Sequence, residues 1–153
     1  SFESVRSRFT SQTSEAAYDY WIIGQPLVEV GLETHSSYWE AIEKFVLSRA
    51  GEGRFGAYLP HRRETGSKTA ATFQQQGLNL EPLYVPVEVY ALQTGFPREV
   101  VGFSSTALVT LAMLSDRDID VVSFYDFNAF GANLLRGPQP HHLEALTMLR
   151  RQA

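Results

Sequence analysis

The sequence predicts a Rossmann-like three-layer α/β/α sandwich with five mostly parallel strands in the order 3-2-1-4-5. Short apolar segments alternate with longer helical ones five times along the 153 residues, which is typical of a parallel sheet with helices on both faces. Right-handed crossovers between the strands favour this strand order. Apolar residues make up 44% of the chain and charged residues 20%, a composition that indicates a packed globular core and excludes a disordered chain.

The first half of the chain contains three expected strands and two expected helices. Each strand is a short apolar run bounded by turn residues: Tyr20–Ile23, Arg54–Leu59 and Leu78–Leu83. A helix is expected to begin at Ser37, the N-cap of a capping box with Glu40, and to reach Gly51 as its C′ residue. A second helix is expected over Ser67–Gln76, with Gly77 at its end.

The second half continues the same alternation. Pro86 suits the first turn of a short helix, which Gly95 and Pro97 end. The remaining strands are expected at Val100–Phe103 and Asp120–Tyr125, and the remaining helices at Ser105–Leu114 and Pro140–Arg151. Ligands of such sheets bind beyond the carboxyl ends of the strands, so the polar residues directly after each strand form the candidate site.

Composition and motif content exclude several classes of protein. The chain has 13 basic and 17 acidic residues and a net charge of -4, which argues against a nucleic-acid partner. The absence of cysteine excludes disulfides, thiolate metal sites and cysteine nucleophiles. No dinucleotide fingerprint and no metal-ligand spacing is present, so we expect no cofactor and no metal. Residues 1–19 are polar and begin without Met, so we expect a linker or docking arm there, one domain over 20–153, and a longer parent protein.

An anion site is expected where the fourth strand meets the following helix. Ser104, Ser105 and Thr106 supply hydroxyls and free backbone amides at the start of an apolar helix, and the helix dipole favours negative charge there. Gly102 allows the backbone to approach a ligand closely. The alternative is a simple N-cap, which serine provides in any helix. The first turn of this helix lacks acidic residues, which favours an anion.

A cationic loop follows the second strand. His61, Arg62 and Arg63 suit a phosphate or carboxylate, and at most one of the two arginines is expected to face the ligand. The alternative is a solvated loop in which an arginine pairs with Glu64.

Two further positions complete the candidate site. Glu88 lies in the first turn of the helix after Pro86, where its carboxylate could accept hydrogen bonds from two ribose hydroxyls. The alternative is a carboxylate that only the helix dipole stabilises. Gly24 and Gln25 form the exit turn of the first strand, at the centre of the expected sheet.

Four segments, taken in this order, resemble the C-terminal half of bacterial sialyltransferases of the GT-B fold. They are Ile22–Glu29, Tyr58–Glu64, Pro86–Glu88 and Gly102–Leu108. The resemblance extends from about Tyr20 to Asp126. It is closest to the lipooligosaccharide sialyltransferases, glycosyltransferase family 52, and to the related capsular polysialyltransferases.

The resemblance implies roles for four of the candidate residues. The family binds the CMP part of CMP-sialic acid through a His-Pro motif and a Ser-Ser/Thr motif. His61 would accordingly contact the donor phosphate and act as the catalytic residue, Ser104 and Ser105 would hold the same phosphate, and Glu88 would take the ribose hydroxyls. This chain departs from the family in having Pro60-His61-Arg62 in place of the His-Pro order.

The resemblance also implies a function for the whole chain. It would be the donor half of an inverting, metal-independent sialyltransferase in lipooligosaccharide or capsule synthesis. The acceptor glycan and the catalytic carboxylate would belong to an N-terminal domain that this chain lacks. The enzyme would be cytoplasmic, with peripheral association at the cytoplasmic face of the inner membrane allowed.

Two other functions stay open at this point. The same fold could bind a UDP- or GDP-sugar, whose two phosphates would use Arg62 or Arg63. Alternatively, the domain could be a non-catalytic Rossmann-like module that binds a partner protein or a regulatory nucleotide.

Overall fold

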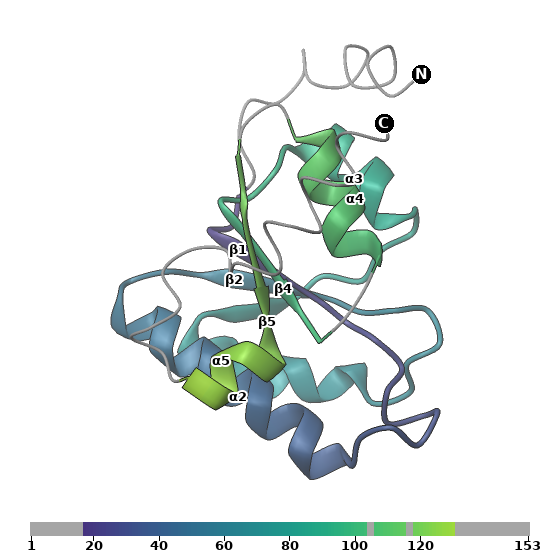
Figure 1. Ribbon diagram of the computed structural model, residues 1–153, viewed down its shortest axis with the longest axis vertical. Coiled ribbons are helices and arrows are strands. Elements are labelled where there is room, and N and C mark those ends of the chain that lie inside the picture. Colours follow the sequence, from purple (N-terminus) through teal and green to yellow (C-terminus); the bar gives the residue numbers. More distant parts are fainter. Residues whose placement is uncertain (1–16, 104–105, 116–117, 131–153) are drawn as a thin grey trace.

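The computed structural model describes residues 17–103, 106–115 and 118–130, and these ranges contain one five-stranded sheet. The strands are β1 (Tyr20–Ile23), β2 (Gly56–Leu59), β3 (Leu78–Leu80), β4 (Glu99–Gly102) and β5 (Asp120–Ser123). Their order is β3-β2-β1-β4-β5 and each pairing is parallel, so the predicted Rossmann-like architecture is confirmed (Figure 1).

Helices cover both faces of the sheet (Figure 1). One face carries α2 (His35–Gly51), the 3-10 helix η1 (Ser67–Gln76) and α5 (Phe124–Phe130). The other face carries α3 (Val87–Thr94) and α4 (Thr106–Leu114). The central strand β1 is buried on both sides, because Tyr20 and Ile22 belong to the first core while Trp21 and Ile23 belong to the second. Burial on both faces explains why β1 reads as a continuous apolar run.

The register places the carboxyl ends of three strands together. Ile23 pairs with Leu59 of β2, and Ile22 pairs with Val101 of β4. The chain after β1 continues this pairing for one residue, since the Gly24 amide donates to the Leu59 carbonyl at 2.8 Å. The turns after β1, β2 and β4 therefore leave the sheet at one edge, where the sequence places the candidate site.

The boundaries of α2 differ from the expectation. The N-cap is Thr34 and not Ser37: the Thr34 hydroxyl accepts from the Ser37 amide at 3.0 Å, and the Ser37 hydroxyl accepts from the Thr34 amide at 3.1 Å. Ser37 thus fills the third helical position, which glutamate usually occupies in a capping box. At the other end Gly51 is the last helical residue, and Gly53 adopts the left-handed conformation with φ 74°.

Other element boundaries and one helix type also differ from the expectation. The strands β2 and β3 are shorter than predicted, beginning at Gly56 and ending at Leu80. The helix over Ser67–Gln76 is a 3-10 helix, and Gly77 ends it in the left-handed region with φ 91°. The strand β4 begins and ends one residue earlier than expected.

The predicted strand Asp120–Tyr125 ends early, at Ser123. The Ser123 hydroxyl donates to the Phe103 carbonyl at 3.0 Å and accepts from the Tyr125 amide at 3.2 Å. These two bonds turn the chain directly into α5, whose Phe124 and Phe127 enter the core beside α2. Aromatic residues suit a strand and a buried helix equally well, which is why the pattern was misleading.

The ends of the chain are described only in part. Tyr18 and Asp19, at the end of the expected arm, both bond to the domain: the Tyr18 hydroxyl donates to Glu81 at 2.6 Å, and Asp19 exchanges two bonds with Phe55. The rest of the expected arm and the expected helix Pro140–Arg151 lie outside the described residues. Among the helices of the described ranges, none has the length and apolar character needed to cross a membrane.

Candidate functional site

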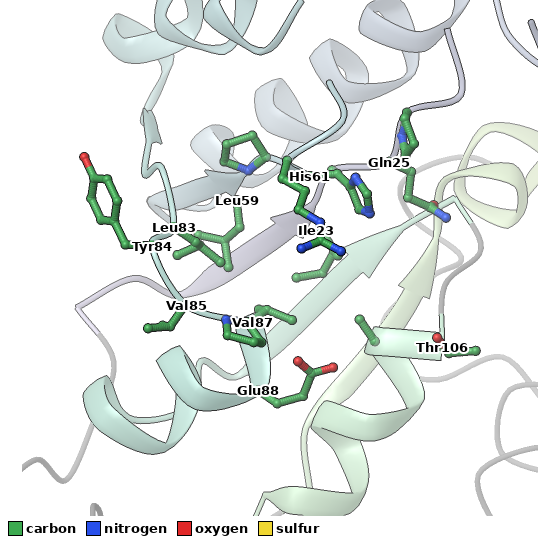
Figure 2. Close-up of a pocket in the computed structure, with 16 residues that line it drawn as sticks. Ile23, Gln25, Leu59, His61, Leu83, Tyr84, Val85, Val87, Glu88 and Thr106 are labelled. Carbon is green, nitrogen blue, oxygen red and sulfur yellow. The ribbon is translucent and has the colours of Figure 1, made fainter. Parts of the chain in front are cut away.

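A pocket of about 710 Å³ opens at the carboxyl edge of the sheet (Figure 2). Its walls come from the turns after β1 and β2, the segment leading into α3, and the starts of α3 and α4. Six residues that the sequence singles out line it together: Gly24, Gln25, His61, Arg62, Glu88 and Thr106. The remaining two candidates, Ser104 and Ser105, lie outside the described residues. The volume is in the usual range for small-molecule sites, roughly 300–1,000 Å³.

The pocket has one cationic, one acidic and one apolar side. His61, Glu88 and Thr106 line the pocket from three different segments of the chain (Figure 2). The apolar side is the segment Leu83–Val85, in which Tyr84 is 96% exposed. Such a division suits an amphipathic ligand that combines an anionic group, hydroxyls and a flat or apolar part.

The cationic loop after β2 is folded by its own polar groups. The His61 amide donates to Glu64 Oε1 at 2.9 Å, and the Arg63 amide donates to His61 Nδ1 at 3.1 Å. Because Nδ1 accepts a hydrogen bond, the neutral His61 ring carries its proton on Nε2, where it can serve as a donor.

The expected alternative, an arginine paired with Glu64, does not occur in the described part of the chain. Arg62 and Arg63 are both exposed, and only Arg62 lines the pocket. Only one of the two guanidinium groups therefore belongs to the pocket.

The turn after β1 is fixed by Gln25. Its side-chain oxygen accepts from the Phe103 backbone amide at 3.1 Å, and its backbone amide donates to the Tyr38 hydroxyl at 3.1 Å. Gln25 thereby joins the ends of β1 and β4, next to the start of α4. A further link comes from Glu29, whose carboxylate accepts from the Thr65 amide at 2.9 Å and from the Thr65 hydroxyl at 3.0 Å. These hydrogen bonds lower the pKa of Glu29, and the bond from the Thr65 backbone amide has the largest effect.

Glu88 is half-buried in the first turn of α3. It follows Pro86, which precedes the first helical residue and has an extended conformation. Its carboxylate has no hydrogen-bond or ion-pair partner among the described residues. Within the described ranges, both acceptor oxygens therefore stay open to a ligand in the pocket.

Three residues that the sequence pattern did not assign to the site support the pocket from behind. Glu64 Oε2 accepts from the Tyr58 hydroxyl at 2.6 Å, and the Tyr58 and Tyr38 hydroxyls lie 2.6 Å apart. The pKa of Glu64 is raised to about 7, mainly by burial and to a smaller extent by the nearby Glu29 carboxylate, while the bonds from Tyr58 and the His61 amide oppose the increase.

Burial also raises the pKa values of both tyrosines, so their hydroxyls remain protonated donors. A sequence signal for one of them existed. The alternation in β2 places Tyr58 on the α2 face, but nothing in the sequence spacing links it to Glu64.

Gly24 is the residue around which these groups close. A Cβ at this position would overlap the Glu64 carboxyl and would lie 2.7 Å from the Tyr58 hydroxyl. The exit turn of β1 therefore needs glycine for close approach, and not for a left-handed conformation.

Comparisons of the chain with protein-family models, with curated proteins and with solved structures each gave no match. Among the described residues, no group of three or more His, Asp or Glu side chains is arranged to hold a metal ion. The fold and the pocket together define a Rossmann-like α/β domain with a pocket at the carboxyl ends of its strands.

Proposed function

We propose that this chain is the donor-binding domain of a glycosyltransferase and that its pocket binds the CMP part of CMP-sialic acid. The observation that carries the proposal is the meeting of His61, Arg62, Glu88 and the start of α4 in one pocket at the centre of the sheet. The order of the motifs, which resembles that of the bacterial sialyltransferases, supports the same ligand.

Each side of the pocket fits one part of CMP. The phosphate would lie between His61 and Thr106, because cationic side chains and the amides of a helix start both favour an anion. The ribose hydroxyls would donate to the Glu88 carboxylate, which has no described partner. The base would lie against the apolar segment Leu83–Val85.

The chemistry follows from the charge that develops on the leaving group. When the bond between sialic acid and CMP breaks, the electron pair goes to the phosphate oxygen, and positive charge held in advance stabilises it. Arg62 would supply that charge, and His61 would donate a hydrogen bond from Nε2 to the departing phosphate. A second domain would bind the acceptor glycan, of lipooligosaccharide or capsule, and would supply the base that activates it. The enzyme would act in the cytoplasm, at or near the inner membrane.

A UDP- or GDP-sugar is the second candidate, and one observation favours it. Arg62 and Arg63 are exposed beside His61, so the loop has more positive charge than a single phosphate needs. A non-catalytic module that binds a nucleotide or a partner protein is the third.

Titration of CMP, UDP and GDP against the whole chain by calorimetry separates these candidates. Binding of CMP alone supports the sialyltransferase proposal, binding of UDP or GDP supports the second candidate, and no nucleotide binding supports a partner-binding module. His61→Ala should weaken CMP binding by about tenfold or more, as expected for the loss of a charged hydrogen bond. His35→Ala, which changes an exposed histidine outside the pocket, is the matched control.

A further inference from the structure

A hydrogen-bond chain runs behind the pocket from the turn after β1 to the loop after β2. The Gln25 amide donates to the Tyr38 hydroxyl, and the Tyr58 hydroxyl donates to Glu64 Oε2. Tyr58 has only one proton to donate, so the Tyr38–Tyr58 bond of 2.6 Å must be donated by Tyr38. All the bonds therefore point the same way and end on the carboxylate, an arrangement in which neighbouring bonds strengthen one another.

The hydrogen-bond chain is anchored to backbone amides at the ends of three strands. Glu64 Oε1 holds the His61 amide, the Tyr38 hydroxyl holds the Gln25 amide, and the Gln25 side chain holds the Phe103 amide. The Tyr38 ring also stacks on the Phe103 ring, with centroids 4.8 Å apart and planes at 17°. One connected network thus links the turns after β1 and β2, which line the pocket, to Phe103 at the end of β4.

The surroundings of Glu64 contain no compensating positive charge within the described ranges. The groups that act on its carboxyl are Tyr58 of β2, the amide of His61 in its own loop and the Glu29 carboxylate in the loop after β1. Tyr38 of α2 completes the set through Tyr58. A half-buried carboxyl without a cation is costly to maintain for stability alone, and its pKa of about 7 places both charge states within reach near neutral pH.

We propose that Glu64 is the positioning residue of the pocket: through Tyr58 and Tyr38 its carboxylate fixes the turns that carry Gln25 and His61. This proposal rests on the proposed nucleotide function of the pocket. Glu64 does not line the pocket, so it acts on a ligand only through the loop that it holds. Protonation of Glu64 replaces the charged acceptor at the end of this hydrogen-bond chain with a weaker neutral one, and so weakens the bonds that hold both turns.

The first test uses the chain without ligand. The chemical shifts of the Gln25 backbone amide and the Glu64 carboxyl carbon are followed by nuclear magnetic resonance from pH 5 to pH 9. Both signals should titrate with one midpoint near 7, and Tyr58→Phe, which keeps the buried ring, should abolish the response of Gln25. His61→Ala should leave that response in place, which excludes the imidazole as its source.

The second test measures CMP affinity. Glu64→Gln should weaken CMP binding by about tenfold, the size expected when one charged hydrogen bond is lost, and Tyr58→Phe should weaken it in the same direction. Glu40→Gln changes an exposed glutamate of α2 and should bind CMP like the unchanged chain. If Glu64→Gln does not fold, Tyr58→Phe and Tyr38→Phe give the same readouts.

The two tests separate this proposal from the function on which it rests. A Gln25 amide that titrates unchanged in Tyr58→Phe overturns the positioning role, whether or not CMP binds. Unaltered CMP affinity in Glu64→Gln also overturns it. Failure of the unchanged chain to bind CMP, UDP or GDP overturns the proposed function instead.

Discussion

Gly24 and Glu64 show how single residues connect the fold to the pocket. Gly24 leaves room at the end of β1, and the Glu64 carboxyl fills it from the loop after β2. The contact joins segments that are distant in the sequence, so it could not be read from local spacing. The need for glycine and the burial of the acid are consequences of the same packing.

Substitution of Gly24 by alanine should destabilise the fold by about 1–3 kcal/mol, because the new methyl group would displace the Glu64 carboxyl and the Tyr58 hydroxyl. Gly51→Ala is the matched control. Its Cβ would meet nothing within 4 Å in a helix, so stability should be unchanged or higher by up to about 1 kcal/mol. Urea unfolding measures both, and equal stability of the two variants would refute the packing described for Gly24.

The raised pKa of Glu64 predicts a specific pH dependence of stability. The folded chain holds this proton to about pH 7, whereas the ordinary value of the group is 4.5, so the folded state binds the proton more tightly. The resulting stabilisation is present below pH 4.5 and is lost as the pH rises through 7. Glu64→Gln should remove this loss, so its free energy of unfolding relative to the unchanged chain should improve by about 2 kcal/mol between pH 5 and pH 8. Parallel pH profiles for the two proteins would count against a buried, titrating Glu64.

A buried ion pair joins α2 to β4 at the amino ends of the strands, opposite the pocket. Arg49 Nε and Nη2 each donate to Glu99 at 2.8 Å, and the guanidinium lies 4.4 Å from the Phe45 ring centre. Both charged side chains are almost completely buried. Their pairing fixes the position of α2, which carries Tyr38. The ion pair thereby supports Tyr38 although the pair itself lies far from the pocket.

Removal of one partner of this pair should be much more costly than removal of both. Arg49→Met or Glu99→Leu leaves a buried charge unpaired and should cost about 3–5 kcal/mol, while the two changes combined should cost far less than their sum. Arg54→Met breaks an exposed pair with Glu52 at 3.5 Å and should change stability by less than about 1 kcal/mol. Thermal unfolding of the four variants provides the test, and additive single effects would contradict it.

At the scale of the whole molecule, strand order was predictable and boundaries were not. The apolar runs of β1, β2 and β4 are short and bounded by turn residues, so connection rules were sufficient to order them. The N-cap of α2 was misplaced because Thr34 and Ser37 are both good capping residues, and only their mutual bonds decide between them. The end of β5 depends on Ser123 reaching Phe103, a contact between strands that no local pattern encodes.

The residues of the candidate site were also predictable only in part. Residues that directly follow strands, such as His61 and Gln25, were identified because topology alone brings strand ends together. The supporting acid Glu64 and its tyrosine partners were not, because their roles depend on side-chain burial and direction. Lining residues follow from topology, whereas the groups that position them follow from packing.

The central claim is that the carboxyl edge of this sheet binds CMP. Amide chemical shifts recorded during a CMP titration test it most directly. We expect saturable changes confined to the pocket: Gly24, Gln25, His61, Glu88 and Thr106. Amides at the amino ends of the strands, such as Arg98 and Asp120, should not move. Changes centred on those amino ends, or no saturable change at any pocket amide, would contradict the account.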